Sequence, residues 1–246
     1  MSTTKQDNLK GQRALVTGAT SGIGRAVALD LARDGAEVLV HGRDAARGAE
    51  TVEAITAAGG KARFVAADLS DATDVRRLAG EVGDIDILVN NAGMSVFGPT
   101  AELDVDTFDR MFASNVRAPF FLVAAIAPGM AARGKGSIVS VSSMAGHVGL
   151  EGGASYGATK AAIEAMTRAW AAEFSPSGVR VNAIAAGPVY TGMSRPEFTG
   201  ALGETTPMNR ASQPEEIAEV VAFLASPRAS YVTGATVAAD GGRTAV

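Results

Sequence analysis

Cysteine is absent from the 246-residue sequence, and histidine occurs only at His41 and His147. The chain therefore cannot form disulfides, use a thiol nucleophile or build a cysteine-based zinc site, and two histidines leave little material for another metal centre. Basic charge is also scarce, because 26 Asp and Glu outweigh 22 Lys and Arg, for a net charge of −4. Without surplus basic charge, binding to phosphate backbones is not expected. We expect a small-molecule partner, no metal and no nucleic acid.

Long apolar segments are also missing. The opening decapeptide MSTTKQDNLK is polar and has no hydrophobic stretch of the kind found in a signal peptide. The longest apolar run, Ala118–Ala132, contains Pro128 and Gly129 and is shorter than a membrane span requires. We therefore expect a soluble cytoplasmic protein that does not associate with membranes.

Short runs rich in Val, Ile and Leu recur along the chain, separated by stretches with helical patterning. These runs are Ala14–Thr17, Glu37–His41, Arg63–Ala67, Ile85–Asn90, Ser137–Val141, Arg180–Ala185 and Thr236–Ala239. Runs of this kind are typical of strands buried on both faces, and their alternation with helices favours a parallel sheet covered by helices on both sides. We predict an α/β fold with a doubly wound, seven-stranded parallel sheet, formed by residues 1–246 as a single domain.

The segment 193–210 interrupts this alternation. It contains two prolines and two glycines among isolated apolar residues and shows no periodicity of its own. Long connections without regular structure are often lids or binding loops, although a plain surface loop fits the same pattern. We predict a substrate lid at about residues 190–212.

A glycine-rich turn, Thr17–Gly24, lies between the first strand and the first helix. Its spacing is G-x3-G-x-G, in Gly18, Gly22 and Gly24. Glycines at such a turn let the backbone approach a pyrophosphate at a helix N-terminus, although a simple strand-to-helix corner would have the same residues. Its place in a strand–helix–strand unit favours a dinucleotide site.

The second predicted strand ends in His41-Gly42-Arg43-Asp44, where a dinucleotide fold meets the adenosine ribose. An acidic residue there would bind the ribose hydroxyls of NAD, but this chain has Gly42. The guanidinium of Arg43 suits a 2′-phosphate, which favours NADP(H) over NAD(H). The alternative is a solvated Arg43 beside Asp44. His41 could contact the adenosine or simply close the strand.

Tyr156 and Lys160 lie four residues apart in a helical stretch, so they share one helix face. A phenol alone is a poor acid–base group at neutral pH, but a neighbouring ammonium favours the phenolate. A Tyr and a Lys at this spacing also occur as ordinary exposed pairs on helices. The remaining pattern decides between these interpretations.

That pattern consists of Thr17–Gly24, Asn90-Asn91-Ala92-Gly93, Asn115, Ser143 and the pair Tyr156/Lys160. In order and spacing it resembles the short-chain dehydrogenase/reductase family over nearly the whole chain. The resemblance implies a Rossmann fold and a catalytic tetrad of Asn115, Ser143, Tyr156 and Lys160. Tyr156 would exchange a proton with the substrate oxygen, Ser143 would orient that oxygen, Lys160 would support Tyr156 and bind the nicotinamide ribose, and Asn115 would hold a water for reprotonation of Lys160.

The resemblance also implies a set of cofactor contacts. They are Gly18, Thr20, Ser21, Gly22, Ile23, Gly24, Arg43, Asp68, Leu69, Asn91, Ala92, Gly93, Tyr156, Lys160, Gly187, Val189 and Thr191. Two positions depart from the family's pattern. The proline after the sixth strand comes one residue late, in Ala186-Gly187-Pro188, and Ser21 stands where NADP-preferring members often have a basic residue.

We therefore predict an NADP(H)-dependent oxidoreductase that interconverts a ketone and a secondary alcohol by hydride transfer. The segments 207–210 and 213–218 resemble the 3-oxoacyl-carrier-protein reductase branch, so a 3-oxoacyl thioester is one candidate substrate. Apolar residues near the expected pocket suggest a hydrophobic substrate: Val96, Phe97, Val148, Leu150, Met193 and Phe198. The family resemblance further implies a homotetramer or homodimer built on the helix with Tyr156 and on the stretch Val105–Arg133.

Three other interpretations remain at this point. The first is an NAD-dependent alcohol, sugar or steroid dehydrogenase of the same family, and the second is a dinucleotide sensor without turnover. The third is a serine hydrolase, because Gly153-Ala154-Ser155-Tyr156-Gly157 matches G-x-S-x-G. In such hydrolases the catalytic His follows the Ser, whereas no His occurs after His147, so the residue order argues against a hydrolase.

Overall fold

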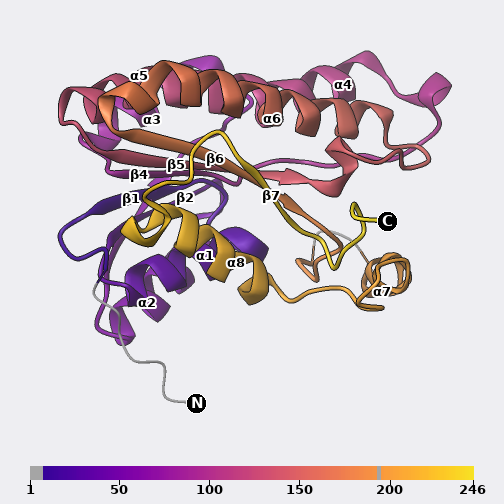
Figure 1. Cartoon of the computed structure of the whole chain (residues 1–246), viewed down its shortest axis with the longest axis horizontal. Helices are drawn as coiled ribbons and strands as arrows, with labels where there is room; N and C mark the ends of the chain where they lie inside the picture. The colour runs from indigo at the N-terminus through magenta and orange to yellow at the C-terminus, as the bar shows by residue number, and fades with distance from the viewer. Residues whose placement is uncertain (1–7, 193–194) are drawn as a thin grey trace.

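The computed structural model describes residues 8–192 and 195–246, and its centre is one seven-stranded sheet (Figure 1). All strand pairs are parallel, in the order β3-β2-β1-β4-β5-β6-β7. The strands are β1 (Arg13–Val16), β2 (Glu37–Gly42), β3 (Lys61–Ala66), β4 (Ile87–Asn90), β5 (Gly136–Ser143), β6 (Val179–Ala186) and β7 (Thr236–Ala239). Each predicted apolar run overlaps one strand, so the predicted doubly wound α/β fold is confirmed.

Helices cover both faces of the sheet (Figure 1). One face packs against α1 (Gly22–Arg33), α2 (Ala45–Ala57) and α8 (Pro214–Ala225) through side chains such as Val27, Ile55 and Val221. The other packs against α3 (Ala72–Val82), α5 (Ala118–Ala132) and α6 (Ala154–Phe174) through Leu78, Leu122 and Trp170. Strands buried on both faces, such as β4 with all four residues buried, explain the continuous apolar runs.

The strand order reverses between β1 and β4, which creates a switch point at the carboxyl edge of the sheet. Open α/β sheets bind ligands at such a point, outside the carboxyl ends of the strands. The glycine turn leaves β1 here, and the segment beginning at Asn91 leaves β4 here. The fold therefore brings two of the predicted cofactor segments to one edge.

A single helical run leads from α4 (Val105–Phe112) through a π-helical turn at Ala113–Arg117 (η2) into α5. The wider turn lies at Asn115, and such turns often occur at functional sites. By length and composition the run Val105–Ala132 could cross a membrane, with a mean hydropathy of 1.3 in its most apolar window, and half of that window is buried inside the molecule. Its apolar character is accounted for in part by packing of α5 on the sheet.

The segment after β6 contains a helix that the sequence pattern did not predict, α7 (Pro196–Glu204). Pro196 and Glu197 in the first turn favour a helix start, but Gly200 and Gly203 mask its periodicity. Gly203 is needed because a Cβ there would lie 2.2 Å from the Ala211 nitrogen. The prediction of an irregular excursion was therefore wrong for these residues, and Met193, expected near the substrate, lies outside the described residues.

The connection between β6 and α8 is closed at its base by a strand-like pairing. Val189 pairs with Ser212, whose N–H donates to the Pro188 carbonyl at 2.9 Å, and the Tyr190 N–H donates to the Ser212 carbonyl at 3.1 Å. The two ends of this connection are thus held together beside the carboxyl end of β6. Its function as a lid stays a prediction.

Candidate active site

The glycine turn brings the chain into close contact with itself. Gly18 and Gly22 have φ of +64° and +50°, a region that favours glycine. A Cβ on Gly24 would lie 2.2 Å from the Gly18 carbonyl oxygen and 2.3 Å from Asn91 Nδ2. The glycines therefore permit both the tight turn and the close packing of α1 beneath it.

The N-terminus of α1 can hold an anion. Ser21 makes no side-chain capping hydrogen bond, and the first turn contains no acidic residue. The first N–H groups of a helix have no intrahelical acceptor and carry partial positive charge. The N–H groups of Gly22, Ile23 and Gly24 are thus suited to a pyrophosphate. These residues fit the phosphate portion of a dinucleotide.

Thr191, predicted to contact the cofactor from the far end of the sequence, lies next to this turn. A Cβ on Gly22 would be 3.0 Å from Thr191 Cβ, so the two segments face each other closely. Gly187 at the end of β6 is also constrained, because a Cβ there would lie 2.6 Å from Asp240 Cα. Although its proline is shifted by one residue, the segment after β6 still reaches the glycine turn.

The segment after β4 is fastened to the turn by hydrogen bonds. Thr17 Oγ1 accepts the N–H groups of Asn91 and Ala92, both at 3.0 Å, and donates to the Val89 carbonyl. Asn91 Nδ2 donates to the carbonyls of Thr17 and Gly18 at 2.9 and 3.2 Å. These bonds fix the segment after β4 against the glycine turn, where Asn91 and Ala92 are predicted to contact the cofactor. The sequence pattern identifies Thr17 only as the first residue of the turn and gives no sign of these contacts.

At the end of β2, Thr20 covers Gly42. A Cβ on Gly42 would lie 2.4 Å from Thr20 Cγ2, so an acidic side chain cannot be placed there without displacing Thr20. Arg43 is exposed beside this point. Asp68 lies at the neighbouring end of β3, and its pKa is lowered chiefly because the Ser70 N–H and hydroxyl donate to its carboxylate, with a smaller contribution from the charge of Arg43. Leu69 is buried next to it.

The catalytic candidates Tyr156 and Lys160 meet on α6. Lys160 is buried, and its ammonium lies 5.6 Å from the centre of the Tyr156 ring. Lys160 Nζ donates to the Val141 carbonyl on β5 at 2.9 Å, which fixes the side chain toward the sheet edge. A Cβ on Gly93 would lie 3.8 Å from the same Nζ, so Lys160 also borders the segment after β4. The pair is therefore not the ordinary exposed pair considered above.

Ser143 ends β5 and caps the following short helix. Its Oγ accepts the Ala145 N–H at 3.2 Å. Because the oxygen acts as an acceptor there, the hydroxyl hydrogen can be donated to a ligand. The adjacent Ser142 points the other way and donates to Glu164 Oε1 at 2.6 Å.

Asn115 is held in the π-helical turn by three hydrogen bonds. Its amide donates to the Met94 carbonyl at 2.8 Å and to Thr159 Oγ1 at 3.1 Å, and its Oδ1 accepts the Met94 N–H at 2.9 Å. A Cβ on Gly93 would lie 3.0 Å from Asn115 Oδ1. Asn115 thus lies beside the same glycine that borders Lys160, and it links η2, α6 and the segment after β4.

An apolar wall adjoins Tyr156. The ring of Phe97 is 5.5 Å from the Tyr156 ring, and a Cβ on Gly153 would be 2.9 Å from Phe97 Cε1. The Gly98 N–H donates to the Gly152 carbonyl at 3.0 Å, which joins the loop after β4 to the loop before α6. The structure thus brings Phe97, one of the residues expected to contact an apolar substrate, to the tyrosine.

His147, in the loop between β5 and α6, is partly exposed and pairs with a buried carboxylate. Its ring is 40% exposed, but Nε2 lies 2.9 Å from Oε2 of the buried Glu164. Glu164 is one helical turn beyond Lys160 and also accepts from Ser142. Its pairing with His147 was missed because nothing in the local sequence links the two residues.

The position of Ser155 does not support a serine hydrolase. Ser155 lies in the first turn of α6 after a loop, not at the strand-to-helix corner that a hydrolase nucleophile requires. No cluster of three or more His, Asp or Glu capable of holding a metal occurs within residues 8–192 and 195–246.

The chain matches known proteins over nearly its whole length. Residues 18–244 match the enoyl-(acyl carrier protein) reductase family model. Galactitol 2-dehydrogenase (L-tagatose-forming) from Cereibacter sphaeroides is 41% identical, over 96% of each chain. A solved short-chain dehydrogenase/reductase family protein is 51% identical with a TM-score of 0.90, over 97% of this chain and 100% of that one.

A further solved structure was described as an NAD(P)-dependent gluconate 5-dehydrogenase from Beutenbergia cavernae, with NADP bound at low occupancy. It is 37% identical with a TM-score of 0.93, over 98% of this chain and 100% of that one. The glycine turn and the neighbouring tyrosine and lysine agree with these similarities. The chain belongs to the short-chain dehydrogenase/reductase family, whose members are oxidoreductases that act on CH–OH or carbonyl groups with a nicotinamide dinucleotide.

Proposed function

We propose that the protein is a cytoplasmic, NADP(H)-dependent reductase that interconverts a ketone and a secondary alcohol. One observation carries this proposal. The buried Lys160 ammonium lies beside the Tyr156 ring, at the same carboxyl edge of the sheet where the glycine turn leaves β1. A dinucleotide sensor would not need a buried lysine beside a tyrosine. Burial of a cation is costly, so its retention here favours a chemical task.

Tyr156 is the proton donor in this proposal. The nicotinamide cofactor, when bound, supplies the hydride. As negative charge develops on the carbonyl oxygen of the substrate, the Tyr156 hydroxyl donates its proton to that oxygen, and the Ser143 hydroxyl donates a hydrogen bond to it. Both donors are held by the fold before the substrate arrives, so they stabilise the developing charge without reorganisation.

Lys160 and Asn115 support Tyr156. The positive charge of Lys160 favours the phenolate left after proton transfer. Only one Nζ hydrogen is needed for the Val141 carbonyl, so the ammonium can also reach a ribose hydroxyl of the cofactor. Asn115, fixed by Met94 and Thr159, borders the same glycine and would hold the water that returns a proton to Lys160.

The preference for NADP(H) rests on the end of β2. Residue 42 is a glycine covered by Thr20, so the acidic side chain that usually accepts from the ribose hydroxyls of NAD is missing there. Arg43 next to it offers charge-assisted hydrogen bonds to a 2′-phosphate. The NADP bound to the relative from Beutenbergia cavernae supports this assignment.

The substrate class we propose is a 3-oxoacyl thioester. The apolar wall formed by Phe97 against Tyr156 suits an acyl chain, and the matching family model is that of enoyl-(acyl carrier protein) reductase, whose name points to a carrier-bound acyl substrate. The proposed lid at residues 190–212, whose base is held by the pairing of Val189 with Ser212, would close over such a chain. A polyol or sugar substrate is the second candidate, since the relative from Cereibacter sphaeroides is a galactitol dehydrogenase.

We also propose that the protein assembles as a homotetramer or homodimer. Phe108 on α4 and Phe120 and Phe121 on α5 are each at least 40% exposed. Together with Met166 of α6, residues of η2 and α5 line a surface groove. Exposed aromatic patches of this kind often mark subunit contacts.

An activity panel tests the proposed function. Purified protein is mixed with NADPH or NADH and with a 3-oxoacyl thioester, a ketose, a steroid ketone or a simple cyclic ketone, and loss of nicotinamide absorbance is followed. We expect the fastest loss with NADPH and the thioester. Cofactor binding without turnover of any carbonyl would identify a sensor, and a preference for NADH with ketoses would favour a polyol dehydrogenase.

A further inference from the structure

His41 is buried at the end of β2, directly beneath the glycine turn. The residue is 2% exposed, and its strand pairs with β1 and β3. Nδ1 lies 3.2 Å from the Gly18 nitrogen, and Nε2 lies 3.2 Å from the Ala67 carbonyl oxygen. The His41 backbone carbonyl accepts the Ala19 N–H at 2.8 Å. One residue therefore contacts two successive residues of the turn and the segment that leads to Asp68.

The partners fix the protonation of the ring. The Gly18 N–H can only donate, so Nδ1 must be an acceptor without a proton. The remaining proton is on Nε2, which donates to the Ala67 carbonyl. Burial lowers the pKa of His41 to about 4, so the ring is neutral at physiological pH, although Asp74 opposes this effect and Arg43 and Arg77 add to it. A neutral ring of this tautomer is the form that both contacts require.

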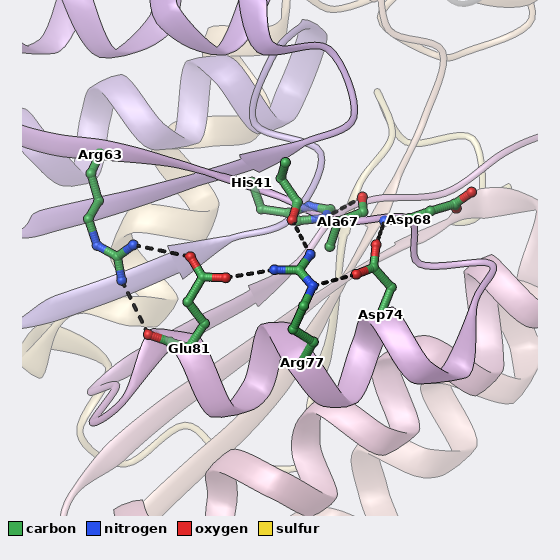
Figure 2. Close-up of polar contacts among 8 residues, drawn as sticks. His41, Arg63, Ala67, Asp68, Asp74, Arg77 and Glu81 are labelled. Atoms are coloured by element: carbon green, nitrogen blue, oxygen red, sulfur yellow. Dashed lines mark hydrogen bonds and ion pairs between the residues drawn. The ribbon is translucent and has the colours of Figure 1, made fainter.

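The backbone on either side of Ala67 is held by a polar network on α3 (Figure 2). Asp74 accepts the Asp68 N–H at 2.6 Å, and Arg77 donates to the Ala66 carbonyl at 2.5 Å. Arg77 also donates to Asp74 and to Glu81. The residues on both sides of Ala67 are thus anchored independently of His41, which gives the imidazole a fixed reference point.

We infer that His41 is a positioning residue for the adenosine half of the cofactor. The Ala67 carbonyl accepts the Nε2 proton, which leaves Nδ1 without a proton, and Nδ1 then holds the Gly18 N–H of the glycine turn. In the proposed function, on which this inference rests, this turn binds the phosphates next to the adenosine. His41 touches no reacting atom, and its effect is on binding.

Two substitutions separate the two contacts. In His41→Asn the amide oxygen is bonded to Cγ, the same atom that carries Nδ1 in histidine. This oxygen can therefore still accept the Gly18 N–H. His41→Gln places its amide as far out as Nε2 and can reach Ala67 but not Gly18. Because Asp74 and Arg77 anchor the Ala67 side, only loss of the Gly18 contact is expected to loosen the site.

Binding of 2′,5′-ADP and of NADP⁺ is measured by calorimetry on the full-length protein, with melting temperatures as a check of folding. We expect about tenfold weaker binding of both ligands to His41→Gln, and binding to His41→Asn within about threefold of the wild type. Equal affinities for the two variants would overturn the inference. A wild type that binds neither ligand would overturn the proposed function and this inference with it.

A measurement on the unsubstituted protein does not depend on either variant folding. Nitrogen NMR of the labelled imidazole reports which ring nitrogen carries the proton. We expect the neutral tautomer with the proton on Nε2 throughout pH 6–8, and the Gly18 amide to exchange slowly. A proton on Nδ1, or a Gly18 amide that exchanges freely, would overturn the inference while leaving the proposed activity intact.

Discussion

Lys160 Nζ lies 5.6 Å from the centre of the Tyr156 ring while it donates to the Val141 carbonyl on β5. This arrangement gives Lys160 two expected tasks, support of the phenolate and binding of the nicotinamide ribose. We therefore expect Lys160→Ala to lower kcat at least about a hundredfold and to weaken cofactor binding as well. Steady-state kinetics and calorimetry measure the two effects.

Lys135→Ala, which removes an exposed lysine, is the control. Loss of only one of the two properties would contradict the double function.

Arg43 tests the cofactor preference. If its guanidinium binds the 2′-phosphate, Arg43→Ala should raise the KM for NADPH about tenfold to a hundredfold and leave the KM for NADH nearly unchanged. Arg47→Ala, which removes an exposed arginine paired with Asp44, is the matched control. Equal changes for both cofactors would show that Arg43 is an ordinary solvated residue.

The glycine turn can be tested by a pair of identical substitutions. A Cβ on Gly24 would collide with Gly18 and Asn91, so Gly24→Ala should lower the free energy of unfolding by about 1–3 kcal/mol and weaken cofactor binding. Gly80 lies exposed on α3 with no atom within 4 Å of an added Cβ. Gly80→Ala should raise stability by about 0.5–1 kcal/mol through helix propensity. Chemical denaturation measures both, and a tolerated Gly24→Ala would contradict the packing described.

We expect the free energy of unfolding to depend on pH through the buried carboxyl group of Asp30. Burial raises its pKa to about 6, against 3.8 when exposed, despite the nearby Arg33. A raised carboxyl pKa stabilises the folded state at low pH, and this contribution is lost as pH rises from about 4 through 6. Asp30→Asn should therefore be more stable than the wild type by roughly 1 kcal/mol at pH 7.5. The difference should shrink as the pH falls to 4.

Denaturation midpoints measured across pH 4–8 test this, with the exposed Glu53→Gln as the control. A wild type more stable than Asp30→Asn at pH 7.5 would mean that the ion pair with Arg33, 3.0 Å away, outweighs the cost of burial.

Much of this site could be predicted from the sequence because its signals are local. Strands buried on both faces give continuous apolar runs, and the glycine turn and the Tyr156/Lys160 spacing lie within single segments. The contacts that were missed join segments distant in the chain. His41 reaches Gly18 only through the register of β1 and β2, and Thr20 covers Gly42 only because the turn folds over the end of β2. His147 and Glu164 pair across the loop before α6.

Helix α7 was missed for a different reason. Its two glycines interrupt the apolar periodicity of a helix. Gly203 is required because the backbone of Ala211 packs against it, which helix propensity does not reflect. A packing requirement imposed by a later segment cannot be detected in the periodicity of the earlier one.

The most direct test of the account is the turnover of Tyr156→Phe with NADPH and the best carbonyl substrate of the activity panel, next to Tyr231→Phe, which alters a fully exposed tyrosine. Removal of the hydroxyl should lower kcat by at least about a hundredfold, because the group that gives its proton to the substrate oxygen is then missing, while the Kd for NADPH stays within about twofold. Tyr231→Phe should match the wild type. Undiminished turnover by Tyr156→Phe would contradict the assignment of Tyr156 as the proton donor and, with it, the proposed mechanism.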